Sequence, residues 1–272
     1  MIFCAIVQII NREVMIFNLI YFFVFLFGLA VGSFLNCLIF RLEKNESFLK
    51  GRSYCPHCKH KLNWQDLIPV FSFLILKGKC RYCQKKISWQ YPLVELAAAI
   101  LFTLIIHYTF PNFLFSIFYF LLSCFLIIIF VYDLKHYLIL DKVIYPAIFT
   151  SFLCNLILHS GFYILNSIYS ALGASAFFLS IFLISRDKWL GFGDVKLGFF
   201  MGLFLSFPKI LVALFFAYLI GAIIGIGLVL AKKKTLKSEV PFGPFLVTGT
   251  FFALFFGNQI IYWYLNFLNL TP

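Results

Sequence analysis

The sequence predicts an all-α, polytopic integral membrane protein: a helical bundle of about eight spans with a small zinc-ribbon-like loop. Three observations predict this class. Hydrophobic residues make up 63% of the 272 positions and charged residues 12%, whereas soluble domains average about 45–50% and about 25%. The hydrophobic residues gather in long uninterrupted runs. Half of the cysteines lie in one basic loop as two Cys-x-x-Cys pairs.

Apolar runs define the predicted spans, because a membrane helix needs about 20 apolar residues. They are 16–40, 91–108, 113–132, 143–159, 162–185, 195–207, 210–231 and 242–267. The run 195–207 is short for a span, which leaves seven spans as an alternative count, with this run tilted into the bundle or preceded by a re-entrant turn. Residues 1–14 lack the basic start and small-residue cleavage site of a signal peptide, and Met15 is an alternative start.

Basic residues predict the orientation. The segment 41–90 holds half of the 22 Lys and Arg residues, and such loops face the cytoplasm. The loops 133–142, 186–194 and 232–239 then fall on the same side, and the opposite side keeps only Arg12 and Lys209. This pattern predicts the cytoplasmic, or inner, membrane and argues against nucleic acid as the partner of a chain with net charge +12. Anionic membrane lipids are the expected partners of the basic loop.

The paired cysteines predict a metal centre. Two thiolates three positions apart grip one side of a tetrahedral ion, and a second pair closes it. Four thiolates leave no open position, so the predicted zinc is structural. Two incidental reduced pairs or a disulfide pair are the alternatives, and His57 and His60 are possible substitute ligands. The predicted ligands are Cys55, Cys58, Cys80 and Cys83.

Two aspartates predict a catalytic site. Asp133 ends the run 113–132 and Asp194 precedes the run 195–207, so both are expected at the cytoplasmic edge of the membrane. Two adjacent carboxylates share one proton. The ionised one accepts a proton from water, and the protonated one donates to the carbonyl oxygen of an amide. The alternatives are an interfacial acid paired with Lys135 and, for Asp194, a helix N-cap.

Five further residues are candidates for supporting this pair. Gly191 and Gly193 are expected to allow positive φ and close approach of a substrate strand. Lys196 is expected to pair with a carboxylate. Asp141 competes with Asp133 as the partner of Asp194, because eight residues along one helix do not exclude it. Glu95, one turn into an apolar run, is expected to be a hydrogen-bonded acid more than a catalytic one.

Together these segments resemble the bacterial type IV prepilin leader peptidases, relatives of the intramembrane Gly-x-Gly-Asp aspartyl proteases. Five motifs follow in order along nearly the whole chain, and Asp133 occupies the first catalytic aspartate position between the third and the fourth. They are Gly32-Ser33-Phe34-Leu35-Asn36 followed by Arg41-Leu42, the paired cysteines, Tyr91-Pro92-Leu93-Val94-Glu95, Gly191-Phe192-Gly193-Asp194-Val195-Lys196-Leu197 and Pro241-Phe242-Gly243-Pro244-Phe245. The sequence departs from the family at Leu140, where a proline usually precedes the acid.

The resemblance implies an activity and favours Asp133 over Asp141 as the catalytic partner of Asp194. The substrates of this family are the prepilins and pseudopilins of type IV pili and type II secretion, whose basic leader is cut on the cytoplasmic side. Many members also N-methylate the new N-terminus with S-adenosylmethionine. No residue is assigned to that cofactor.

The expected domains are an N-terminal segment and first span at 1–40, the Cys4 loop at 41–90, associated with methyl transfer, and an aspartyl peptidase domain at 91–272. Two other functions compete with this reading: a non-enzymatic, zinc-stabilised membrane scaffold and a proton-linked transporter. Catalysis predicts that Asp→Asn changes abolish cleavage of a substrate, whereas a scaffold predicts that they lower stability alone.

Overall fold

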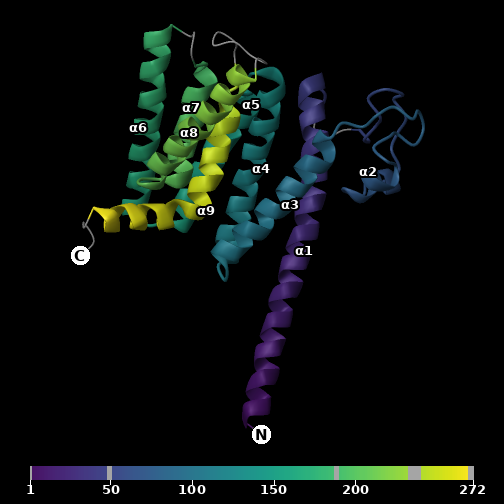
Figure 1. Ribbon diagram of the computed structural model, residues 1–272, viewed down its shortest axis with the longest axis horizontal. Coiled ribbons are helices and arrows are strands. Elements are labelled where there is room, and N and C mark those ends of the chain that lie inside the picture. Colours follow the sequence, from purple (N-terminus) through teal and green to yellow (C-terminus); the bar gives the residue numbers. More distant parts are fainter. Residues whose placement is uncertain (1, 48–50, 187–189, 232–239, 269–272) are drawn as a thin grey trace. The chain divides into compact units, whose positions relative to one another are not determined.

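The computed structural model describes residues 2–47, 51–186, 190–231 and 240–268, with side chains from residue 17 onward, and these residues are almost entirely helical (Figure 1). Two isolated β-bridges are the only β-type pairings within these ranges. The helices are α1 (Ile2–Lys44), η1 (Trp64–Leu67), α2 (Phe71–Ile75), α3 (Gln90–Thr109), α4 (Phe113–His136), α5 (Asp141–Leu158), α6 (Gly161–Ser185), α7 (Phe192–Leu205), α8 (Lys209–Leu230) and α9 (Gly243–Phe267).

Seven of the described helices are long and apolar enough to cross a membrane, which makes this a multi-pass membrane protein. The short apolar run 195–207 forms α7, which has 14 residues and is not among the seven. The structure therefore favours the alternative count of seven full-length spans, with α7 as an additional short helix. The helix α1 is longer than predicted, because its backbone continues without a break from Ile2.

The chain forms two compact units, Met1–Phe120 and Leu121–Pro272. In the first unit α1 packs along α3. Gly28 and Gly32 of α1 make this contact close, since a Cβ at Gly32 would lie 2.6 Å from the Cα of Glu95. Small residues at such contacts let helix backbones approach, which is the usual basis of helix packing in membranes.

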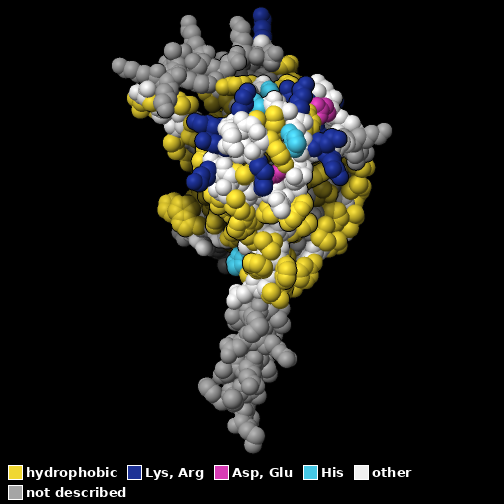
Figure 2. Space-filling view, turned by 90° about the vertical axis from the view of Figure 1, so that its right-hand side faces the viewer, with side chains coloured by type: hydrophobic (Ala, Val, Ile, Leu, Met, Phe, Trp, Pro, Cys, Tyr) yellow, Lys and Arg dark blue, Asp and Glu magenta, His cyan; other side chains and the backbone are white. Residues whose placement is uncertain are grey.

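The loop between α1 and α3 contains both cysteine pairs, η1 and α2. On the face of the molecule shown in Figure 2, Lys and Arg side chains gather in the upper part and hydrophobic side chains cover the area below them. This separation is typical of a protein surface that meets the boundary between water and lipid.

In the second unit α7 is the central helix, because it contacts α5, α6, α8 and α9. Gly198 and Gly202 face α6, where a Cβ at Gly202 would collide with the backbone of Ala171. In Figure 1, α4 ends and α5 and α7 begin at the same end of this unit. The loops 187–189 and 232–239, which carry part of the predicted cytoplasmic charge, lie outside the described residues.

Candidate active site and metal centre

Asp133 lies in the last turn of α4 and is buried, with 5% of its surface exposed. Its Oδ2 accepts a hydrogen bond of 3.0 Å from the backbone N–H of Gly243, the first residue of α9. The donor residue lies 110 positions further along the chain, in another helix. A buried carboxylate requires such a hydrogen-bond partner. This geometry differs from the alternative of an interfacial acid held by Lys135.

Asp194 lies in the first turn of α7 and is also buried, with 8% of its surface exposed. The charge of Asp133 acts on it, so the two carboxyl groups of this unit interact electrostatically. The N-cap of α7 is Gly191, and no side chain caps the helix. The interpretation of Asp194 as the N-cap is therefore wrong: Gly191 occupies that position, and the Asp194 carboxyl group interacts with the backbone N–H of Gly191.

Two residues at this site were not singled out from the sequence. Gly243 is required where it is, because a Cβ at this position would lie 2.5 Å from Asp133 Oδ2. The available signal was the Pro241-Phe242-Gly243 motif, which marks the residue but does not reveal that its N–H is the functional group. Tyr218 of α8 interacts electrostatically with Asp194, and its ring lies 5.1 Å from that of Phe242.

The glycines before Asp194 do not have the predicted backbone conformation. Gly191 has φ −79° because it is the extended N-cap of α7. Gly193 is the second residue of that helix and is not among the positive-φ glycines. Its role is steric, since a Cβ there would lie 3.0 Å from the side chain of Ile139, whereas Gly191 faces open space. The expectation of positive φ was therefore wrong.

Lys196 pairs with a carboxylate, as predicted, and the partner is Asp141. The Lys196 Nζ lies 2.5 Å from Asp141 Oδ1 and 5.0 Å from the centre of the Tyr145 ring. Asp141 is the first residue of α5, and α4 has already ended at His136. The assumption that Asp133 and Asp141 share one helix was wrong. Asp141 is more than half exposed, unlike the buried Asp133.

The four loop cysteines come together in the first unit. Their ligand atoms all lie within 4.8 Å of one another, and the sulfur atoms of Cys55 and Cys83 are 3.9 Å apart. A tetrahedral ion with metal–sulfur bonds near 2.3 Å requires sulfur–sulfur edges of about 3.8 Å. The cluster therefore fits a bound metal ion. His60 instead packs against Tyr82, with ring centres 3.7 Å apart and the rings tilted by 34°.

Each cysteine pair sits in a hairpin with the same hydrogen bonds. The N–H of the first cysteine donates to the carbonyl five residues on, and the N–H four residues on donates back to that cysteine. This holds for Cys55, with His60 and Lys59, and for Cys80, with Lys85 and Gln84. Lys59 and Gln84 both have φ of 57°. The two turns therefore match in their hydrogen bonds and in φ, and each can present two thiolates to one tetrahedral ion.

The thiols differ in their pKa values. Burial opposes ionisation of Cys55, but the backbone N–H groups of Cys58 and His57 outweigh it and lower the pKa to about 7. For Cys83, the N–H of Lys85 favours the thiolate, but desolvation and the neighbouring thiols raise the pKa to about 11. Neighbouring thiols thus favour the Cys55 thiolate and oppose that of Cys83, and a bound cation would stabilise all four thiolates together.

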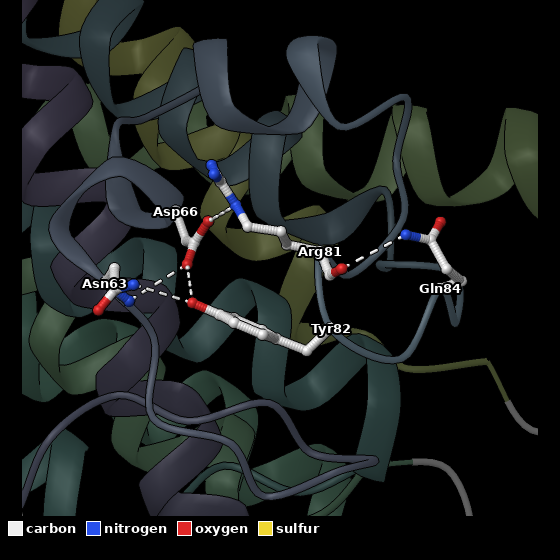
Figure 3. Close-up of polar contacts among 5 residues, drawn as sticks. All are labelled: Asn63, Asp66, Arg81, Tyr82 and Gln84. Atoms are coloured by element: carbon white, nitrogen blue, oxygen red, sulfur yellow. Dashed lines mark hydrogen bonds and ion pairs between the residues drawn. The ribbon is translucent and has the colours of Figure 1, made fainter.

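A polar network holds the second hairpin against η1 (Figure 3). Asp66 accepts hydrogen bonds from Arg81 Nε at 2.8 Å, from the Tyr82 hydroxyl at 3.3 Å and from the N–H of Asn63 at 3.2 Å. The Asn63 amide also donates to the Tyr82 hydroxyl, and the Gln84 amide donates to the Arg81 carbonyl. The Asp66 side chain is 4% exposed, so this part of the loop is tightly built.

Glu95 is the hydrogen-bonded acid that was predicted. It is buried in the second turn of α3, and its Oε2 accepts a 2.7 Å hydrogen bond from the N–H of Val70. Ser33 of α1 also donates to it. Val70 is β-branched and has φ 61°, a conformation that costs on the order of 1–3 kcal/mol and persists only when its surroundings hold it. Glu95 therefore ties the loop to both helices.

These features define a class of protein: a multi-pass helical membrane protein with two interacting buried carboxyl groups in one unit and a four-cysteine metal-type centre in the other. Comparison with known families gives the same division. Residues 26–109 match the bacterial peptidase A24 N-terminal domain, and residues 120–226 match the type IV leader peptidase family. The chain belongs to the type IV leader peptidase family.

Curated relatives cover nearly the whole chain. A protein of Aeromonas hydrophila is 33% identical over 90% of this chain and 94% of its own length. One of Bacillus subtilis (strain 168) is 35% identical over 89% of this chain and 96% of its own, and one of Legionella pneumophila is 30% identical over 91% and 95%. Each is named prepilin leader peptidase/N-methyltransferase. No solved structure matches the chain significantly.

Proposed function

We propose that this chain is an aspartyl endopeptidase that removes the basic leader of prepilins or pseudopilins, and that Asp133 and Asp194 are its catalytic residues. The observation that carries the proposal is the electrostatic interaction of these two buried carboxyl groups, which come from α4 and α7. Family membership and the names of the relatives support the substrate class.

In this mechanism the pair holds one proton between its two carboxyl groups. We assign the ionised role to Asp133, whose Oδ2 accepts the 3.0 Å hydrogen bond from the N–H of Gly243. Asp194, which has its own backbone donor in Gly191, takes the protonated role in this assignment. Asp133 takes a proton from water, whose oxygen attacks the scissile carbonyl carbon. Asp194 donates its proton to the carbonyl oxygen. As the C–N bond breaks, a proton passes to the leaving nitrogen, and the pair again holds one proton.

The test uses the full chain in proteoliposomes with a basic-leader prepilin, and the new N-terminus is read by mass spectrometry. Asp133→Asn and Asp194→Asn are each expected to lower the cleavage rate by at least about 10³-fold, since each removes a group of the proton-transfer pair. Asp141→Asn is the matched control and is expected to keep cleavage within about tenfold.

Folding of each variant is checked by its thermal midpoint in detergent. Retained cleavage in either Asn variant would refute the assignment. An equal loss of cleavage in Asp141→Asn would instead assign the second catalytic carboxylate to Asp141. A loss of stability in both Asn variants, with no cleavage by the parent chain, would favour the scaffold.

We further propose that the chain N-methylates the new N-terminus, with S-adenosylmethionine as the methyl donor, as the names of the relatives imply. The first unit offers a buried polar cluster in which Asn36 donates to the Tyr91 carbonyl and accepts from Gln90. Gln90 Oε1 is buried without a partner, an atom that a bound polar ligand would satisfy. The same mass spectra report methylation with and without added donor.

The remaining proposals concern metal and placement. We propose structural zinc as the metal of the cysteine cluster, because four thiolates in tetrahedral spacing suit zinc and leave no open position. We place the loop 41–90 and the two aspartates at the cytoplasmic face of the inner membrane, on the distribution of basic residues. We assign 1–40 to the N-terminal segment, 41–90 to the loop with methyl transfer, and 91–272 to the peptidase domain.

A further inference from the structure

The Cys4 loop carries an exposed apolar face, formed by residues in and between η1 and α2 and by Trp89. Trp64 is 73% exposed and Ile75 is 74% exposed. So many large apolar side chains facing solvent within one short loop segment, outside the candidate spans, are uncommon except at interaction sites. The residues of this face are Trp64, Leu67, Ile68, Phe71, Leu74, Ile75 and Trp89.

The depth of this face is fixed by α3. The Val70 N–H, between η1 and α2, bonds to Glu95, the sixth residue of α3. Five residues of helix span about 7.5 Å, so the segment lies beside the membrane-spanning helix below its first turn. A surface at this level meets the boundary between headgroups and acyl chains.

The face is rigid. Asp66 holds η1 to the second cysteine hairpin through two donors, Arg81 Nε and the Tyr82 hydroxyl, and it also accepts from the N–H of Asn63, the N-cap of η1 (Figure 3). Phe73 of α2 is buried, and its ring lies 5.0 Å from that of Trp89, so it packs Trp89 against α2. The apolar side chains are therefore presented outward by a fixed scaffold, which lowers the entropy cost of inserting them.

Cations follow the face directly in the chain. Lys77 comes two residues after Ile75, and Lys79 pairs in a β-bridge with Lys86. The face of the molecule in Figure 2 shows basic side chains above a hydrophobic area. Apolar residues that enter the acyl boundary, with Lys above them at the headgroups, are the pattern of an interfacial anchor.

We infer that η1 and α2 form a membrane anchor that inserts this face into the leaflet from which α1 and α3 emerge, with the nearby lysines contacting anionic phospholipid headgroups. The anchor fixes the height of the Cys4 loop above the membrane through Val70 and Glu95. It is independent of the peptidase activity, so its test does not depend on cleavage.

The test places a single tryptophan at position 64 of the full chain by changing Trp89, Trp189 and Trp263 to Phe. The protein is reconstituted in vesicles of phosphatidylglycerol and phosphatidylcholine that carry bromine at shallow or deep acyl positions. Shallow bromines are expected to quench Trp64 at least about twofold more than deep ones. A Trp263-only variant, within the span α9, is the positive control for contact with lipid.

Quenching of Trp64 by iodide from the water phase, without quenching by lipid bromines, would overturn the inference. A second variant keeps all four tryptophans and carries photoreactive benzoylphenylalanine at Ile75. Phospholipid adducts are expected in mass spectra. An adduct to a second copy of the chain or to a prepilin, with none to lipid, would show that the face is a protein-docking surface instead.

Discussion

The cysteine cluster and the carboxylate pair are built in opposite ways. The four cysteines span fewer than thirty residues, and each pair is positioned by hydrogen bonds within its own hairpin. The two aspartates are 61 positions apart in the sequence, and the donor to Asp133 comes from a third helix. The first site is a local module, whereas the second exists only when α4, α7 and α9 are assembled.

This difference predicts different failures. A local module depends on its metal and on a few polar contacts, and it should unfold without disturbing distant helices. An assembled site depends on close helix contacts, and it should lose function when a single atom is added at a contact. The following tests address that contrast, from the largest expected effect to the smallest.

Removal of the metal should unfold the Cys4 loop. Structural zinc contributes apparent binding energies of about 10–16 kcal/mol in small zinc-binding peptides, so chelation is expected to expose 51–89 to limited proteolysis. Cys80→Ser should do the same, and Cys124→Ser, outside the cluster, should not. Cleavage of prepilin is expected to stay within about tenfold of the parent chain, a change of about 1.4 kcal/mol. Complete loss of cleavage on chelation would show that the two sites are not separable.

Addition of one methyl group should inactivate the carboxylate site. In Gly243→Ala the new Cβ meets Asp133 Oδ2, so the hydrogen bond must break or the carboxylate must move. We expect cleavage to fall by about 10²-fold, which is the cost of a small misplacement of a reacting group. Gly173→Ala, where a Cβ meets nothing within 4 Å, is the matched control. Equal activity of the two variants would contradict the role given to Gly243.

Loss of the Asp66 carboxylate should loosen the module without abolishing it. Asp66→Ala removes the acceptor of Arg81, Tyr82 and Asn63; these donors are exposed and can be hydrated, so each lost hydrogen bond is expected to cost about 0.5–1.5 kcal/mol. The expected result is faster release of the metal to a chelator. Arg81→Ala should have a smaller effect, since Arg81 is 44% exposed. A larger effect from Arg81 would mean that its contact is the principal one.

The smallest effect is expected at the pair of Lys196 and Asp141. Asp141 is more than half exposed, and such ion pairs contribute about 0–1 kcal/mol. Lys196→Met and Asp141→Asn should each lower the thermal midpoint slightly. The double variant should be no worse than either single one, as a double-mutant cycle would show. Additive losses would indicate that each residue has a separate partner.

Much of the fold was predictable from hydrophobic runs alone. The spans 113–132 and 210–231, for example, correspond to α4 and α8 with ends shifted by a few residues. Lipid requires every backbone group in a span to bond within its own helix, so run length determines the element. The same logic missed the helical continuation of α1 back to Ile2, and it missed η1 and α2, because short helices in a polar loop leave no such run.

The carboxylate site was predictable only in part. Asp133 and Asp194 are noticeable because acids are rare in this chain, which has ten, and acids in membranes are costly. The choice between Asp133 and Asp141 could not come from spacing, because α4 ends before Asp141. The contribution of Gly243 is a backbone N–H, which every residue except proline has, so only the assembled helices reveal it.

The length of α7 has a consequence for hydrolysis beside lipid. Its 14 residues extend about 21 Å, against a hydrocarbon layer of about 30 Å. Its two ends cannot reach both polar surfaces at once, and its first turn carries Asp194. Four neighbouring helices, α5, α6, α8 and α9, contact it, so its central position depends on protein contacts and not on its own length. A helix too short to cross thus leaves the Asp194 end of α7 below the membrane surface, and hydrolysis there requires water to reach that depth.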